Sequence, residues 1–122
     1  MVEDNEDRRY AAERLSRAAA RAYSSIACDS EAGDEVRLSA AEQLAEANPH
    51  AAAEALAAIA CDREVGDEVR LSAAEQLAES NPYAAAEAFA AIARDREVGD
   101  EVRLSAAEQL GSVGHQRHAG RR

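Results

Sequence analysis

The chain has 122 residues and a formal net charge of −10 at pH 7. This length allows one domain or one array, and the negative charge argues against a nucleic-acid backbone or an anionic membrane surface as the main partner. No apolar run is long enough to span a membrane, and the acidic start does not fit a secretory signal. We therefore expect a cytoplasmic protein whose partners are basic.

Hydrophobic residues make up 47% of the chain, but more than half of them are alanine. Large apolar side chains are too few to fill a thick globular core, whereas alanine lets helices approach closely. Alanine is also the best helix former. The composition therefore favours an all-α protein, with residues 1–122 as a single helical domain.

A 33-residue period organises the sequence. The block Gly-Asp-Glu-Val-Arg-Leu-Ser-Ala-Ala-Glu-Gln-Leu stands at 33–44 and returns unchanged at 66–77 and 99–110. A fixed period of this size is the signature of a repeat architecture. We expect an α-solenoid of about three two-helix repeats, in which 33–65 and 66–98 are full periods.

The segment before the first block departs from this pattern. No Asn-Pro pair stands near Ser16, where the period would place a helix start, so the sequence from Asp7 to Ala27 favours one long helix. Terminal units of repeat arrays are usually atypical. Residues 7–32 are therefore expected to form an N-terminal capping helix and the first loop.

The first helix of each later unit has a clear start signal. Asn48-Pro49 and Asn81-Pro82 combine a side chain that caps free amides with a residue that fits the first helical position. These helices are expected over 49–60 and 82–93. Their few large apolar side chains share one face and should form the core: Leu56, Ile59, Phe89 and Ile92.

The second helix of each unit follows a loop, at 62–66 or 95–99. Asp67 and Asp100 are predicted to cap these helices, and the short links between units require antiparallel neighbours. The last helix is expected to occupy 99–110. Gly111 and Gly114 follow it, so the sequence predicts a disordered tail at 111–122.

A helical wheel divides the second helix into two sectors. Val69, Ala73 and Leu77 lie in a wide apolar arc, and Glu68 and Glu75 lie in the opposite sector. An arginine also falls inside each apolar arc, where an unpaired charge would cost several kcal/mol. We expect these arginines to pair with loop carboxylates; the alternative is that they reach past the alanines to water. The arginines are Arg37, Arg70 and Arg103, and the candidate carboxylates are Asp29, Asp62, Asp95, Glu31, Glu64 and Glu97.

An alanine-rich helix, a loop with Asp and then Val-Arg-x-x-Ala-Ala-x-x-Leu resemble bacterial HEAT-like repeats of the short, bilin-lyase type. The Val-Arg pair stands at 36–37, 69–70 and 102–103, and the resemblance covers roughly residues 16–111. It implies that the second helices line a concave side and that the arginine pairs with a loop acid. Ankyrin and tetratricopeptide repeats fit less well, since their signature residues are not met.

Catalytic and metal-binding patterns are weak. His50 is the only histidine within the repeats, and His115 and His118 lie in the expected tail, so no metal site and no cofactor is predicted. Cys28 and Cys61 stand one period apart, and stacked helices at about 10 Å are too distant for a disulfide. We interpret both cysteines as small buried residues. The sequence therefore predicts a protein that is not an enzyme.

We expect an adaptor that uses an acidic concave face to bind a basic protein or peptide. Such an interaction should be screened by salt. The alternative is a structural oligomerisation module, associating through the C-terminal repeat or by domain swapping, or a part of a longer solenoid. The residues expected to meet the partner are Glu35, Glu42, Gln43, Glu46, Glu68, Glu75, Gln76, Glu79, Glu101, Glu108 and Gln109.

Overall fold

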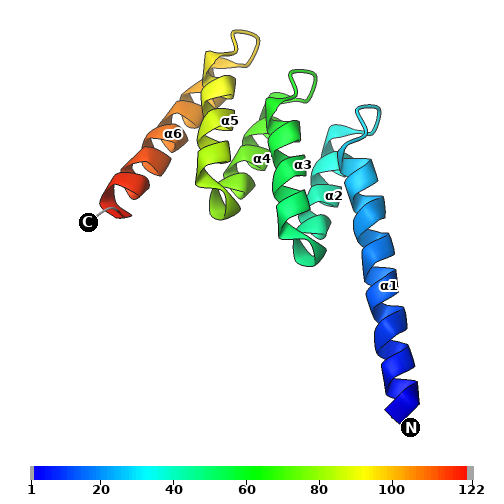
Figure 1. The fold of residues 1–122 in the computed structure, drawn as a ribbon. Helices are drawn as coiled ribbons and strands as arrows, with labels where there is room; N and C mark the ends of the chain where they lie inside the picture. The colour runs from blue at the N-terminus through cyan, green and yellow to red at the C-terminus, as the bar shows by residue number, and fades with distance from the viewer. Residues whose placement is uncertain (1, 121–122) are drawn as a thin grey trace.

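The computed structural model describes the backbone of residues 2–120 and the side chains of residues 8–113. Within these bounds the chain forms helices and no strands, which confirms the all-α class. Successive helices stand in one row, with α1 and α6 at its two ends (Figure 1). The helices are α1 (Val2–Ala27), α2 (Asp34–Ala47), α3 (Pro49–Cys61), α4 (Asp67–Ser80), α5 (Pro82–Arg94) and α6 (Asp100–Gly120).

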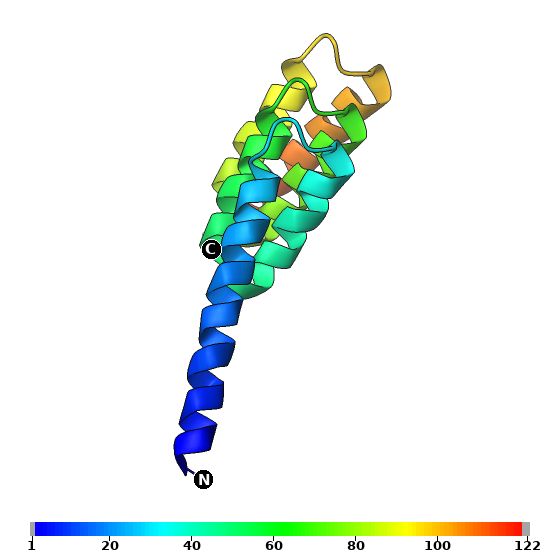
Figure 2. The same ribbon diagram turned by 90° about the vertical axis from the view of Figure 1, so that its right-hand side faces the viewer.

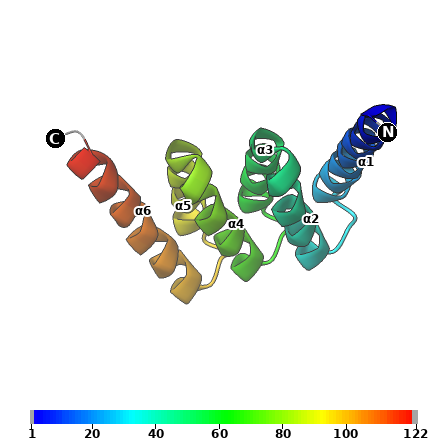
Figure 3. The same cartoon turned by 90° about the horizontal axis from the view of Figure 1, so that it is seen from below.

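The row of helices has two layers. Helices α1, α3 and α5 form one layer, and α2, α4 and α6 form the other (Figures 2 and 3). Neighbours along the chain run antiparallel, and the longer loops lie together along one edge of the row (Figure 1). In the part of the chain that is described, no helix is both long and apolar enough to cross a membrane.

Asparagine caps α3 and α5, as the sequence predicts. The side-chain oxygens of Asn48 and Asn81 accept hydrogen bonds from the backbone N–H groups of Ala51 and Ala84, each at 3.1 Å. A proline then occupies the first turn, where its missing N–H leaves no helical bond unmade. Each cap contributes about 1 kcal/mol and fixes the short turn between neighbouring helices.

Glycine, and not aspartate, is the residue that precedes α2 and α4. Gly33 and Gly66 have extended backbones and provide no side-chain cap, so the predicted capping role of Asp67 is wrong. Asp67 lies in the first turn of α4, where the helix dipole favours a carboxylate. Its Oδ2 instead accepts a 2.8 Å hydrogen bond from the backbone N–H of Gly99 in the next loop.

Apolar side chains from both layers meet in a thin core. Leu56, Phe89 and Ile92 are buried there, as predicted, among alanines that are also buried. Val65 and Val98 join this core from the loops, at 3% and 4% exposure. A helical wheel covers only helices and therefore could not identify them. The buried loop valines fix the loops against the helix layers, which positions the loop carboxylates described below.

Both end helices are longer than the sequence predicts. Helix α1 begins at Val2 and not near residue 7, and its first half projects beyond the α2–α3 turn (Figure 1). Helix α6 starts at Asp100, which is therefore not its cap, and continues to Gly120. The segment 111–120, where the sequence predicts a disordered tail, is part of this helix, and residues 121–122 lie outside the described residues. Gly111 and Gly114 do not end α6, because a glycine inside a helix costs only about 1 kcal/mol and no proline stands after Asp100.

Candidate functional site

Two buried arginines connect successive periods of the chain. Arg37 and Arg70 are only 4% and 2% exposed. The Nε of Arg70 donates to the carbonyl oxygen of Ala60 at 2.9 Å, and its Nη1 donates to Oδ2 of Asp95 at 3.0 Å. Arg37 makes the same contacts to the carbonyl of Ala27 at 3.0 Å and to Asp62 at 3.1 Å.

The ion pairs predicted for the arginines are thus present at Arg37 and Arg70, and each joins one period to the next. The carboxylate partner comes from the loop that follows the next helix, 25 positions further along the chain. The carbonyl partner lies at the end of the preceding helix, where the helix dipole is negative. One guanidinium therefore holds three elements in place: the end of one helix, its own helix and the next loop.

The loop aspartates are held in their ionised form. The pKa of Asp95 is lowered to about 2, first by the backbone N–H of Glu97 and then by the Arg70 guanidinium, both of which donate to its carboxylate. Asp62 has a lowered pKa for the same reasons, through Glu64 and Arg37. These carboxylates keep the buried arginines paired over the whole neutral and mildly acidic range.

Arg103 has only half of this arrangement. Its Nε donates to the carbonyl of Ala93 at 2.9 Å, but no later loop supplies an aspartate among the residues described. The nearest carboxylate is that of Asp100 in its own helix, at 4.0 Å from Nη1. The Arg103 side chain is accordingly 34% exposed. The predicted loop-acid pair is therefore not made at the third arginine.

The structure places the expected partner-facing carboxylates on the solvent side of α2, α4 and α6. Gln43 beside them is exposed, whereas Gln76 and Gln109 are half-buried. We call these glutamates and glutamines the acidic stripe. Its exposed carboxylates are Glu35, Glu42, Glu46, Glu68, Glu75, Glu79, Glu101 and Glu108.

Hydrogen bonds join the acidic stripe from one helix to the next. The Nε2 of Gln76 donates to Oε2 of Glu42, and Gln109 makes the equivalent bond to Glu75. Each amide therefore bridges two helices and fixes a carboxylate at the same place in two successive periods. The sequence indicates that these residues share a face, but the cross-helix bonds appear only in the structure.

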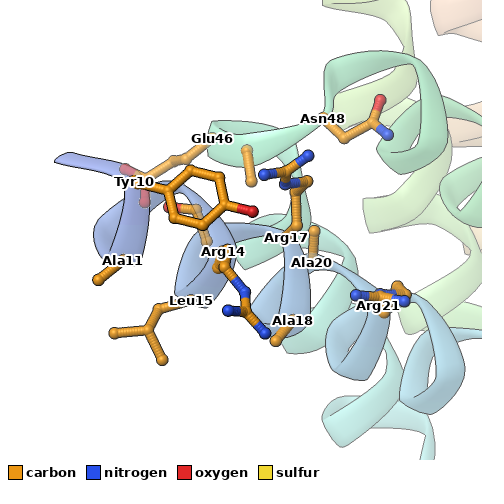
Figure 4. Close-up of a pocket in the computed structure, with 12 residues that line it drawn as sticks. Tyr10, Ala11, Arg14, Leu15, Arg17, Ala18, Ala20, Arg21, Glu46 and Asn48 are labelled. Carbon is orange, nitrogen blue, oxygen red and sulfur yellow. The ribbon is translucent and has the colours of Figure 1, made fainter. Parts of the chain in front are cut away.

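Exposed positive charge lies elsewhere, mainly on α1 and in the loops. Arg14, Arg17 and Arg21 line an open groove where the projecting half of α1 meets the end of α2 (Figure 4). Tyr10 lies on the same wall, with the Arg14 guanidinium 5.8 Å from its ring centre. This groove was not predicted from the sequence, although the spacing of the arginines at three and four positions could have indicated it.

The described side chains offer little for catalysis. No group of three or more His, Cys, Asp or Glu side chains there is arranged to hold a metal ion. His50 is exposed and lies 3.7 Å from Glu54 on the same helix. Cys28 and Cys61 are free and exposed, so their predicted burial is wrong; they lie at helix ends. Partial burial of the thiol raises the pKa of Cys61, which disfavours a nucleophilic thiolate.

The arginine contacts predict unequal effects on stability. Arg37→Met removes both the carbonyl bond and the ion pair, so the free energy of unfolding should fall by roughly 2–3 kcal/mol. Arg103→Met removes the carbonyl bond and only a long, exposed contact to Asp100, and should lower the free energy of unfolding by about 1 kcal/mol. Urea denaturation followed by circular dichroism measures both values. Equal losses in the two variants would contradict the assignment.

The lowered pKa of Asp95 predicts a loss of stability in acid. An ordinary aspartate has a pKa of about 3.9 in the unfolded chain, above the folded value. The stabilising contribution is therefore complete above about pH 5 and is lost as the pH falls through about 2. Asp95→Asn cannot titrate, so its unfolding free energy should change less between these pH values. Parallel pH profiles for the variant and the wild type would refute this.

Comparison with known proteins adds no family assignment. No family model matches the chain, and neither a curated protein nor a solved structure matches it. The resemblance to HEAT-like repeats therefore rests on the Val-Arg-x-x-Ala-Ala-x-x-Leu motif and its period, and the function has to be argued from the surface and the contacts of the chain itself.

Proposed function

We propose that the chain is a HEAT-like α-solenoid that acts as a non-enzymatic adaptor, and that the acidic stripe binds a basic protein or peptide. One observation carries this proposal. Every exposed charged side chain on α2 and α4 is a carboxylate, because the only arginine of each helix is buried. The buried arginines cannot neutralise the stripe, so α2 and α4 present one sign of charge to solvent.

The repetition of the stripe favours an extended partner. Glu42, Glu75 and Glu108 occupy the same position in successive periods, and glutamine bridges hold the first two. A partner with arginines or lysines at intervals could contact several of them at once. Weak single contacts would then add up along one chain, since the later contacts form at a high effective concentration.

Two further points remain part of the proposal. The resemblance to HEAT-like repeats implies that the row of helices is curved and that α2, α4 and α6 line its concave side. An extended peptide would then be enclosed by this side. The carboxylates of the stripe are exposed to solvent, which favours recognition of a charged partner over acid–base catalysis. The proposal also includes a cytoplasmic location in a bacterium.

Charge removal along the stripe tests the proposal. The triple variant Glu42→Gln, Glu75→Gln, Glu108→Gln keeps side-chain shape and should bind a labelled oligo-arginine peptide roughly threefold to a hundredfold more weakly, since each exposed ion pair contributes about 0.2–1 kcal/mol. Fluorescence anisotropy at low salt measures the affinity. Wild-type binding should also weaken as salt is raised, because screening acts over about 8–10 Å.

A variant of equal charge serves as the control. Glu54→Gln, Glu64→Gln, Glu87→Gln removes three exposed carboxylates outside the stripe and should bind almost as tightly as the wild type. If both triple variants lose the same affinity, the peptide responds only to net charge and the stripe is not the site. An affinity that does not depend on salt would also contradict the proposal.

A further inference from the structure

In the middle of the row, several side chains contact the next period. At each end of the row, the equivalent side chains lack this partner. At the α6 end, Arg103 lacks a loop carboxylate, as described above. Arg96 is the equivalent of Arg63, which donates to Asp95 and Glu97 of the next loop, but the described residues contain no later loop for Arg96 to meet. The carboxylates of Asp100 and Glu108 are exposed, whereas their equivalents Asp67 and Glu75 accept hydrogen bonds from the next period.

The α1 end carries the groups that would be the partners in the same contacts. Asp29 is the equivalent of Asp62 and Asp95, but the only hydrogen bond to its carboxylate comes from the backbone N–H of Glu31, among the residues described. An arginine partner would stand at position 4, which is Asp4. Gly33 has no atom within 4 Å of where a Cβ would lie, whereas its equivalents contact an aspartate. Gln43 is exposed, and Arg9 stands at the position where the repeat would place a glutamate for it to meet.

Apolar side chains are uncovered at the same two ends. Val36 is 55% exposed, although its equivalent Val69 is 8% exposed. Leu104 is 63% exposed, whereas its equivalent Leu38 is 8% exposed and its equivalent Leu71 is half-buried. Ile26 on α1 is also exposed. In the middle of the row the adjacent period covers these positions wholly or in part, so each end presents apolar surface that the other end would cover.

The directions of the two ends also match. The loops lie along one edge of the row, and the first residues of α1 and the last residues of α6 point toward the other edge (Figure 1). An α6 placed beside α1, as α4 lies beside α5, would therefore run antiparallel to it.

We propose that copies of this chain associate head to tail, with the α6 end of one copy docked on the α1 end of the next. The partner is a second copy, because the open halves are those of contacts that the chain already makes internally. Arg103 of one copy would donate to Asp29 of the next, and Gly33 would donate to Asp100. Such a contact joins two different surfaces and leaves both outer ends open, so growth continues with concentration.

This association is independent of partner binding by the acidic stripe, apart from one added bond between Gln43 and Glu108. Sedimentation velocity over micromolar to millimolar concentrations tests it. The weight-average mass of the wild type should rise from 13.0 kDa toward dimers and longer assemblies as concentration increases. A wild type that stays monomeric throughout would overturn the proposal and assign the two ends to another occupant.

Reversing the charges of Asp29 and Arg103 tests whether these two residues meet in the proposed head-to-tail contact. Asp29→Arg and Arg103→Glu each place like charges across the proposed contact, so each variant alone should remain monomeric at concentrations where the wild type associates. Mixed in equal amounts they should associate again, because the native pair forms in one contact and the two substituted side chains, again of opposite charge, meet in the other. Glu54→Arg, an exposed reversal in the middle of the row, should associate as the wild type does.

A second variant covers the case in which Arg103→Glu unfolds α6. Leu104→Asp changes an exposed side chain, so circular dichroism should be unchanged while the association is lost. Association that survives Asp29→Arg and Leu104→Asp would overturn the head-to-tail contact. So would a mixture of the two charge variants that stays monomeric while the wild type and Glu54→Arg associate.

Discussion

The buried guanidinium of Arg70, and that of Arg37 before it, is the contact on which the arrangement of helices depends. A charge at 2% exposure is tolerated only if its donors are matched, and here a helix-end carbonyl and a loop carboxylate match them. The thin alanine layers supply close packing but few interlocking side chains. The arginine therefore gives the layers a directional contact that fixes each loop against the preceding helix pair.

The same contact shapes the surface. Because each arginine is turned inward, the exposed charges of α2 and α4 are all negative, and the acidic stripe follows from the internal pairing. On the outside, the side chains of Gln76 and Gln109 also connect successive periods, where they hold carboxylates at equivalent positions. At the two ends of the row the internal contacts are interrupted, so Arg103 and Asp29 remain as complementary halves. The helix packing, the acidic stripe and the two end surfaces thus depend on one set of repeated contacts.

The helices and their order could be predicted from the sequence because the period, the Asn-Pro caps and the apolar faces are local signals. The wheel also placed Arg70 among apolar residues and so predicted a carboxylate partner. It could not distinguish the loop before the arginine from the loop after it, because Asp62 and Asp95 both begin the same loop sequence, Asp-Arg-Glu-Val-Gly. Asp67 was misassigned as a cap for a similar reason: its carboxylate serves a backbone N–H one period away, and only the packed structure brings that group near.

A double-mutant cycle on Arg70 and Asp95 tests the central claim most directly, since it isolates the energy of their contact. The free energies of unfolding of Arg70→Met, Asp95→Asn and the double variant are compared with that of the wild type. We predict a clear favourable coupling, so that the double variant is little less stable than Arg70→Met alone. Strictly additive losses would show that the two side chains act independently, and the proposed link between successive periods would then be wrong.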